Sequence, residues 1–193
     1  MRVKLLLAFF CLSILLLPSV FSASSVVEMK LEASLSESDI GIIAGDVSPN
    51  GESVLLVGKD GYAREISALE AEDRSRDIEL VTGRNVDLQD TSWHPRGQAA
   101  LIAGDLGVAL RYETYDNSIT LVNGTGTIIG HNLTTVEWRQ AGDYAYFGAD
   151  DGGVWKFAEG IGFVALDDTR NSSITGISCH RNIDSCVMST LQD

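Results

Sequence analysis

Short apolar runs bounded by turn residues recur along this chain and predict β-strands. Three of them, SVLLVG (53–58), AALIAG (99–104) and YAYFGA (144–149), are almost entirely apolar and only six residues long. A run of this length suits a strand covered on both faces, because a buried helix needs about ten residues or more. Only the segment ISALEAEDR (66–74) has apolar spacing that fits a short helix. The pattern therefore predicts an all-β protein.

Turn signals flank each of these runs at matching places. The turn before each run ends in a glycine, preceded in two cases by a proline, and these residues set the dihedral angles of a tight turn. A second glycine follows each run and precedes a further predicted strand (62–66, 108–112 and 154–157), with outer strands at 118–122 and 162–166. The turns are Pro49-Asn50-Gly51, Pro95-Arg96-Gly97 and Gln140-Ala141-Gly142, and the second glycines are Gly61, Gly107 and Gly152.

The same unit therefore repeats along the chain. When Val47, Trp93, Trp138 and Cys179 are taken as equivalent, the steps between them are 46, 45 and 41 residues. A period of about 40–45 residues is typical of the four-stranded blade of a β-propeller. We expect an all-β propeller of antiparallel four-stranded blades, with about three complete blades and part of a fourth. The approximate repeats are 41–85, 86–130, 131–173 and the incomplete 174–193.

At these residues the chain resembles the WD-repeat β-propellers. The turns Ser48-Pro49-Asn50-Gly51, Asp60-Gly61 and Asp151-Gly152 match the family pattern, and so do Tyr112 and Phe157 at the aromatic end of the third strand. The Trp-Asp dipeptide of the family is absent. The resemblance covers the chain from about residue 40 onward and implies a rigid binding platform. We expect a fragment of a longer propeller; the alternative is a small four-bladed ring completed by a strand near residues 27–31.

The amino terminus has the pattern of a secretory signal. Arg2 and Lys4 precede an apolar run from Leu5 to Leu17, and small residues follow Pro18. The run is shorter than the roughly 20 residues that span a bilayer, which favours a cleaved signal over an anchor. We therefore predict a signal peptide over 1–22, a short strand and linker over 23–40, and a secreted or cell-surface, extracytoplasmic protein. Membrane contact is expected only through residues 1–22, and only if they are not cleaved.

The chain is strongly acidic, with 27 Asp and Glu against 14 Lys and Arg, so its formal charge is −13. Residues 1–22 hold two of the cations and no acid, so the remainder carries −15. Such a charge repels nucleic acid and anionic lipid at long range and keeps a protein soluble. The sequence therefore argues against a nucleic-acid partner.

Cys179 and Cys186 occupy the positions of Trp93 and Ala100 in the second repeat, on facing strands of the first hairpin. Residues that oppose each other in a non-hydrogen-bonded pair lie about 4.5 Å apart at Cα, within reach of a disulfide. An exported chain meets an oxidising compartment. The sequence therefore predicts a Cys179–Cys186 disulfide.

Other residues that could carry chemistry form no compact pattern. His94, His131 and His180 lack the spacing of a metal site, no serine lies in a nucleophile elbow, and no glycine-rich loop joins a strand to a helix. We therefore predict no catalytic residue, no metal and no cofactor. Three Asn-x-Ser/Thr sequons mark candidate glycosylation sites, at Asn123, Asn132 and Asn171.

Two functions fit these observations. The first is a non-catalytic binding or scaffold module for a protein or another extracellular surface ligand, because titratable residues are not grouped. The alternative is part of a propeller enzyme, a hydrolase or a quinoprotein-type dehydrogenase, whose active-site residues converge from blades mostly outside this chain.

Overall fold

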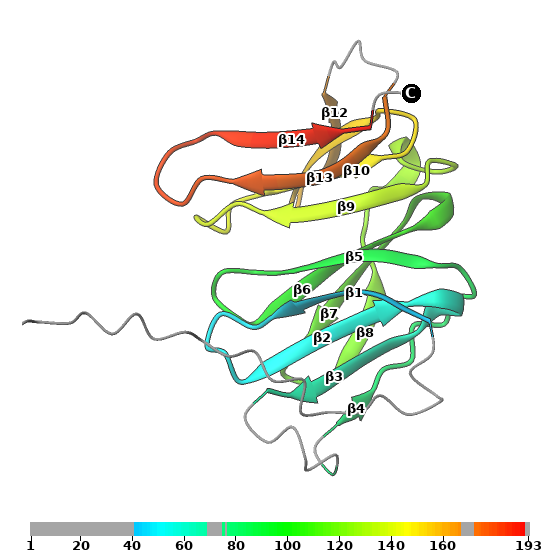
Figure 1. The fold of residues 1–193 in the computed structure, drawn as a ribbon, viewed down its shortest axis with the longest axis vertical. Helices are drawn as coiled ribbons and strands as arrows, with labels where there is room; N and C mark the ends of the chain where they lie inside the picture. Colours follow the sequence, from blue (N-terminus) through cyan, green and yellow to red (C-terminus); the bar gives the residue numbers. More distant parts are fainter. Residues whose placement is uncertain (1–40, 69–74, 76, 167–171, 192–193) are drawn as a thin grey trace, which may run out of the picture. The chain divides into compact units, whose positions relative to one another are not determined.

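The structure, a computed structural model, describes residues 41–68, 75, 77–166 and 172–191 (Figure 1). The predicted signal peptide, the linker over 23–40 and Asn171 lie outside the described residues. Strands dominate the described part, which contains no α-helix; short 3₁₀ turns lie at Lys59–Gly61, Asp105–Gly107 and Thr125–Thr127. None of its helical turns is long or apolar enough to cross a membrane.

The strands form antiparallel sheets in chain order, which we call blades 1 to 4. Blades 1 to 3 have four strands each, and blade 4 has two described strands. Blade 1 comprises β1 (Ile42–Val47), β2 (Ser53–Gly58), β3 (Ala63–Ser67) and β4 (Ile78–Glu79). Blade 2 comprises β5 (Leu88–Trp93), β6 (Ala99–Gly104), β7 (Val108–Glu113) and β8 (Ser118–Leu121). Blade 3 comprises β9 (Leu133–Trp138), β10 (Ala145–Ala149), β11 (Val154–Ala158) and β12 (Gly162–Leu166), and blade 4 comprises β13 (Ile174–Cys179) and β14 (Cys186–Thr190).

The strand predictions are confirmed almost residue for residue. The apolar runs form β2, β6 and β10, the second strand of each complete blade. The short helix suggested at 66–74 is wrong at its start, because Ile66 and Ser67 lie in β3 and pair with Val54 and Ser53; residues 69–74 lie outside the described part. Pairing with an apolar neighbouring strand outweighs a weak local helical pattern.

The glycine of the second turn allows the third strand to begin close to a neighbouring loop. Gly107 has φ +76°, and a Cβ atom there would lie 2.1 Å from the carbonyl oxygen of Ile128. Gly61 is similar, with φ +78° and a Cβ position 2.0 Å from the carbonyl oxygen of Arg84. Only glycine fits such a site, because it tolerates positive φ and carries no side chain. These glycines are therefore structural requirements of the repeat.

Successive blades pack face to face through buried apolar side chains. One cluster joins blades 1 and 2, and a second joins blades 2 and 3. Trp93 and Trp138, the repeat markers of blades 2 and 3, are 5% and 2% exposed. The large members are Leu55, Trp93 and Tyr112 in the first cluster, and Leu101, Trp138, Phe147 and Phe157 in the second.

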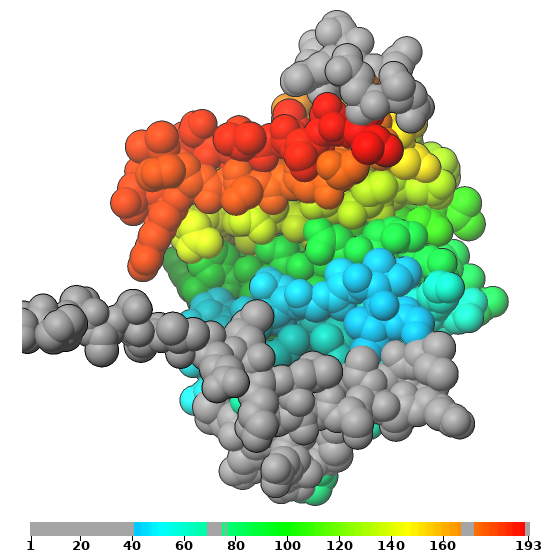
Figure 2. Space-filling model, in the orientation of Figure 1, coloured from blue at the N-terminus to red at the C-terminus, as the bar shows by residue number. Residues whose placement is uncertain are grey.

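The first strands of the blades, which we call the inner strands, lie side by side. β1 contacts β5, β5 contacts β9, and β9 contacts β13. Figure 2 shows this order as successive bands of colour, from blue β1 through green β5 and yellow-green β9 to orange β13. The inner strands of the four blades therefore form one row, in which each strand contacts the next.

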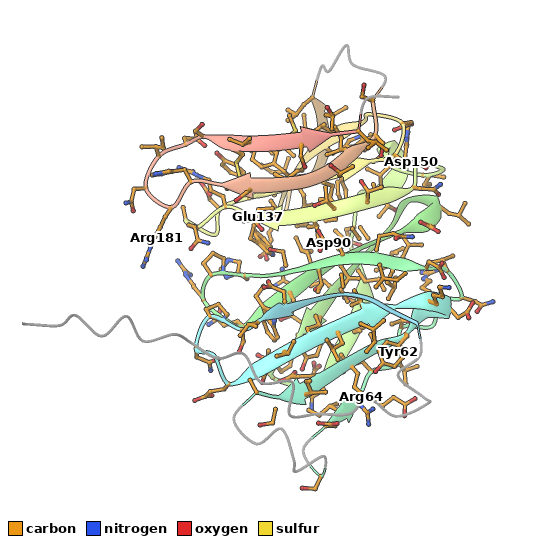
Figure 3. The ribbon with its side chains drawn as sticks, in the orientation of Figure 1. Tyr62, Arg64, Asp90, Glu137, Asp150 and Arg181 are labelled. Atoms are coloured by element: carbon orange, nitrogen blue, oxygen red, sulfur yellow. A yellow bond between two sulfur atoms is a disulfide. The ribbon has the colours of Figure 1, made fainter. Side chains whose placement is uncertain are left out.

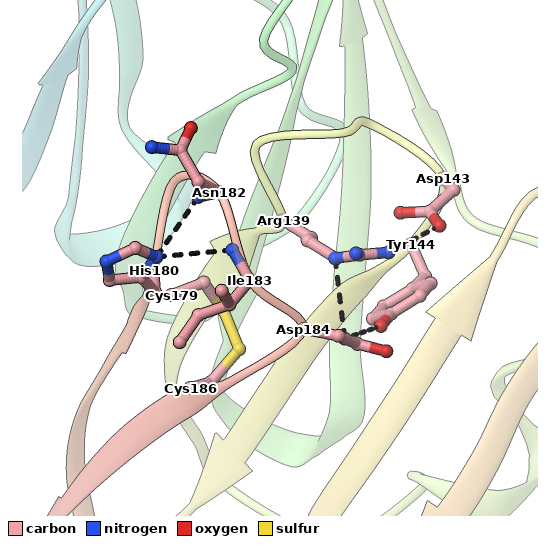
Figure 4. Close-up of polar contacts among 9 residues, drawn as sticks. All are labelled: Arg139, Asp143, Tyr144, Cys179, His180, Asn182, Ile183, Asp184 and Cys186. Carbon is pink, nitrogen blue, oxygen red and sulfur yellow. Dashed lines mark hydrogen bonds and ion pairs between the residues drawn. A yellow bond between two sulfur atoms is a disulfide. The ribbon is translucent and has the colours of Figure 1, made fainter.

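The hairpin of blade 4 is closed by a disulfide. Cys179 and Cys186 pair across β13 and β14 and are bonded through their sulfur atoms, as the sequence predicted. The loop between them is also held by blade 3, because the carboxylate of Asp184 accepts a hydrogen bond from Tyr144 and lies 3.4 Å from Nε of Arg139 (Figure 4). The disulfide therefore fixes both the hairpin and the loop that contacts blade 3.

We expect the double substitution of Cys179 and Cys186 by serine to lower the free energy of unfolding by about 2–3 kcal/mol, because the closed loop is short. Urea unfolding of the exported protein measures this difference, and the wild type treated with a reducing agent should match the variant. Two thiols that react with an alkylating reagent in the native exported protein would contradict the pairing.

Candidate functional site

Each inner strand carries one extra residue near its start. The register between the inner strand and its neighbour shifts by one residue in all four blades, which leaves Ile43, Gln89, Thr134 and Thr175 as the extra residues. Such a β-bulge bends the strand and changes the direction of its side chains. Three of these residues, Gln89, Thr134 and Thr175, line the same groove. The bulge is therefore a repeated device that directs polar side chains to one place.

Side chains of one inner strand accept hydrogen bonds from the backbone of the next. The Trp93 amide donates to Oδ2 of Asp46 at 2.8 Å, and the Trp93 indole Nε1 donates to the Asp46 carbonyl oxygen at 3.0 Å. The inner strand is an edge strand, so its outward amides have no sheet partner. Asp46 therefore satisfies an amide that its own sheet leaves unpaired.

The same contact recurs between the later blades. The Trp138 amide donates to Oγ of Ser92 at 3.1 Å, and the Glu137 carboxylate accepts a hydrogen bond from the Cys179 backbone. Ser92 Oγ in turn donates to Oε2 of Glu137 at 3.4 Å. Asp46, Ser92 and Glu137 occupy equivalent positions, one residue before the repeat marker. We call these contacts the inter-blade bonds.

Asp90 adds a further bond between blades 2 and 3. Its Oδ2 accepts from the Val136 amide and from Oγ1 of Thr135, both at 2.9 Å, and its Oδ1 accepts from the Thr91 amide at 2.9 Å. Three donors compensate a partly buried carboxylate for part of its loss of water. Asp90 is therefore the most fully bonded acid of the inner strands.

The four inner strands line a groove of about 410 Å³, which we call the inner groove. Residues of β1, β5, β9 and β13 all contribute to it, including the acids Asp46, Asp90 and Glu137. No lysine or arginine occurs among its lining residues within the described part of the chain. In Figure 3, Asp90 and Glu137 lie along the facing strands β5 and β9. The inner groove is therefore polar and acidic.

A second hollow of about 500 Å³ continues from the inner groove toward the first turns, and we call it the rim pocket. Asp46 and Glu137 line both hollows. The rim pocket adds Arg181 from the disulfide-closed loop, together with Trp93 and Trp138. A ligand that spans both hollows would therefore contact carboxylates in the inner groove and the cation Arg181 in the rim pocket.

Burial and mutual repulsion disfavour charge on two of the acids. Burial raises the pKa of Asp90, hydrogen bonds from Val136 and Thr135 oppose the rise, and the charge of Asp46 adds to it. Burial also raises the pKa of Glu137, against the bond from Cys179, with the charges of Asp46 and Asp90 adding to the rise. A cation placed among these three carboxylates would favour their charged forms.

The three histidines do not come together and take separate structural roles. Nδ1 of His94 accepts from the Arg96 amide, and Nδ1 of His180 accepts from the Asn182 amide, both at 3.1 Å within their own turns. His131 contacts Oδ2 of Asp151 at 2.5 Å. Across the described residues, no three histidine, cysteine or acidic side chains lie close enough to hold a metal ion.

The candidate glycosylation sites differ in their surroundings. Asn123 is exposed beside β8. Asn132 is partly buried and bonded at both ends of its amide, since Nδ2 donates to Asp150 at 2.9 Å and Oδ1 accepts from the Leu106 amide at 3.2 Å. A glycan on Asn132 would therefore disturb a contact that Asn123 does not have.

The sequence reasoning missed Asp46, Asp90 and Glu137. A signal for two of them was present, because the residue before each repeat marker is polar in every copy: Asp46, Ser92, Glu137 and Ser178. Successive side chains of a strand point to opposite faces, so a polar residue before each repeat marker is expected to face away from the side on which the marker lies. Asp90 has no polar counterpart in blade 1 or 4, where Ala44 and Gly176 occupy its position, so periodicity alone could not identify it.

Comparison with known proteins adds information on the fold. No protein-family model and no curated protein sequence matches this chain. Among solved structures it is similar to the hydrazine synthase of Kuenenia stuttgartiensis, with a TM-score of 0.61 and 12% identity over 77% of this chain and 42% of that one. It is also similar to an auxiliary nutrient binding protein of Bacteroides thetaiotaomicron VPI-5482, with a TM-score of 0.60 and 14% identity over 78% of this chain and 36% of that one.

Both similar structures are β-propeller-type folds of four-stranded antiparallel sheets. The present chain has the same fold. It spans less than half the length of either similar structure, and identities this low indicate shared architecture rather than shared activity. The predicted β-propeller is thus confirmed, while membership of the WD-repeat family stays a prediction.

Proposed function

We propose that this protein is an exported, non-catalytic binding module whose inner groove receives a positively charged segment of a partner protein. The observation that carries the proposal is the convergence of Asp46, Asp90 and Glu137, from three successive blades, on one groove whose described lining has no basic residue. A groove of about 410 Å³ has the size of common ligand sites. Lysine or arginine side chains match its charge.

The electrostatics favour this ligand class. The charges of Asp46 and Asp90 help to raise the pKa of Glu137, so these acids repel one another when no cation is present. An ammonium or guanidinium group among them would replace repulsion by attraction. The acidic surface as a whole would also attract a basic partner and speed its approach.

Export is supported by three observations of different kinds. The amino terminus has the pattern of a signal peptide, the Cys179–Cys186 disulfide suits an oxidising compartment, and one similar structure is a nutrient-binding protein. We therefore place the binding module outside the cytoplasm.

The test is a titration with fluorescein-labelled hexalysine, with hexaglutamate as the comparison peptide. We expect saturable binding of hexalysine alone, with NMR shift changes at residues of β5 and β9. The variant Glu137→Gln keeps an oxygen that can accept from Cys179 but removes the charge, and we expect the dissociation constant to rise about fivefold, which corresponds to about 1 kcal/mol.

The matched control is Glu79→Gln, which changes the same residue type at an exposed position on the outer strand β4. This variant should bind hexalysine about as well as the wild type. Equal losses in both variants, or shift changes confined to the outer strands, would mean that hexalysine binds the acidic surface in general and would refute a specific groove.

A further inference from the structure

The rim pocket contains three hydrogen-bond donors that have no acceptor within the described residues. They are the guanidinium group of Arg181, the side-chain amide of Gln140 and the indole Nε1 of Trp138, and all three residues line the pocket. Arg181 and Gln140 are exposed, whereas Nε1 of Trp138 is buried. Guanidinium and indole groups only donate hydrogen bonds. The rim pocket therefore presents donors to a group that enters it.

Two of these donors are departures from the repeat. Trp93, the counterpart of Trp138, donates from its Nε1 to a carbonyl oxygen of blade 1 at 3.0 Å, whereas Nε1 of Trp138 has no such acceptor. Gln140 stands where blades 1 and 2 have Pro49 and Pro95, which carry no side-chain donor. A buried donor without an acceptor is rare in a folded protein and calls for a specific explanation. A ligand that accepts hydrogen bonds in the rim pocket supplies one.

The guanidinium group of Arg181 is held near the pocket without a partner charge. In Figure 3 its side chain extends from the loop between β13 and β14 toward the side of the earlier blades. The disulfide and the contacts with blade 3 fix this loop. The carboxylates of Asp46 and Glu137 line the same pocket, but they accept from the backbone of Trp93 and Cys179 and form no ion pair with Arg181 in the described part of the chain. The charge of Arg181 is therefore available to an anionic group of a ligand.

We propose that the rim pocket binds a carboxylate, and that the positively charged segment in the inner groove is a carboxyl terminus that ends in lysine or arginine. This inference rests on the proposed function, because it names the part of the partner that enters the same site. A carboxylate accepts two hydrogen bonds from a guanidinium group in a matching planar geometry. Asp46 and Glu137 line both hollows, so a terminal lysine places its ammonium group among the acids and its carboxylate at Arg181.

The experiment compares two hexalysine peptides that carry fluorescein at the amino terminus, one with a free carboxyl terminus and one with a terminal amide. The free acid should bind the exported protein about tenfold more tightly, because its carboxylate bonds to Arg181. General attraction predicts the opposite order, since the amide carries one more net positive charge and the protein has a formal charge of −13. The order of the two affinities therefore separates the rim pocket from the acidic surface in general.

Two variants of the rim pocket should weaken the preference for the free acid. Arg181→Gln removes the guanidinium charge and should lower the preference to less than about twofold. Gln140→Ala removes one donor and should lower it to about threefold. Arg96→Gln is the matched control, because Arg96 is an exposed arginine in the first turn of blade 2 that does not line the rim pocket. This control should keep the tenfold preference, and circular dichroism should show that all variants remain folded.

The indole N–H signals in NMR spectra give a second readout. The Trp138 signal should move with the free acid and not with the amide, because only the free acid brings an acceptor to its Nε1. The Trp93 signal should move little with either peptide, since its Nε1 already donates to Asp46. A Trp138 signal that moves equally with both peptides would place the carboxylate elsewhere and overturn the proposal.

The remaining outcomes separate this inference from the proposed function. Equal affinity of the wild type for both peptides, with shift changes still at β5 and β9, would overturn the inference and leave the proposed function standing. An Arg181→Gln variant that keeps the preference would overturn the inference as well. So would an amidated peptide of five lysines and a final glutamate that binds as tightly as the free acid, because a side-chain carboxylate would then suffice. If neither hexalysine peptide binds, both the inference and the proposed function are refuted.

Discussion

Replacing Gly107 by alanine should lower the free energy of unfolding by about 3 kcal/mol. Two costs combine at this position. The backbone has φ +76°, where a Cβ atom costs about 1–2 kcal/mol. The added atom would also lie 2.1 Å from the carbonyl oxygen of Ile128, so the loop that carries this buried residue must move. Such displacement of a packed segment costs a further 1–3 kcal/mol, roughly.

Urea unfolding followed by tryptophan fluorescence measures this loss. Gly126→Ala is the control, because a Cβ atom there would have no neighbour within 4 Å and the backbone does not have positive φ. This variant should change the free energy of unfolding by less than about 0.5 kcal/mol. A loss below about 1 kcal/mol for Gly107→Ala would mean that the second turn is not held against the Ile128 loop.

Replacing Asp90 by alanine should lower the free energy of unfolding by about 2–3 kcal/mol. The substitution removes one carboxylate that accepts from Thr91, Val136 and Thr135, and it leaves these three donors without their partner. A donor that loses its partner in a partly buried site costs about 1–3 kcal/mol, and water entering the groove recovers part of that cost. Asp143→Ala is the control: Asp143 forms an exposed ion pair with Arg139, which is worth less than about 1 kcal/mol.

The stability lost when Asp90 is replaced depends on pH, and the direction follows from the pKa of its carboxyl group. Burial raises the folded-state pKa of Asp90 above its ordinary value of 3.8, so the folded protein binds the proton more tightly than the unfolded chain. The resulting stabilisation is fully present below the unfolded pKa and is lost as the pH rises through the folded pKa. The loss caused by Asp90→Asn should therefore be larger at pH 3.5 than at pH 7, and the opposite order would contradict the burial of this carboxyl.

The strands, the turns and the disulfide could be predicted because each depends on nearby residues. A run such as AALIAG, with Gly97 before it and Gly107 after it, specifies a hairpin strand by local sequence. Cys179 and Cys186 are seven residues apart, and the turn between them sets their register. Repetition at a constant step then extended each local prediction to the next blade.

The inner groove could not be predicted because its contacts join residues from different repeats. Trp93 and Asp46 are 47 residues apart, and the pairing depends on how two sheets pack rather than on either sequence segment. The bulges at Gln89 and Thr134 also change which side chains face the groove, and simple alternation does not anticipate an extra residue. The sequence therefore shows the acids as polar positions, but it does not show that they line one groove.

Amide hydrogen exchange measured by NMR tests the inter-blade bonds, on which the inner groove depends, most directly. The amides of Trp93, Val136 and Trp138 lie on edge strands, yet each donates to a side chain of the preceding blade. We expect them to exchange as slowly as amides inside the sheets, and Val136 to lose that protection in Asp90→Ala. Exchange of all three at the rate of solvent-exposed amides would contradict the account.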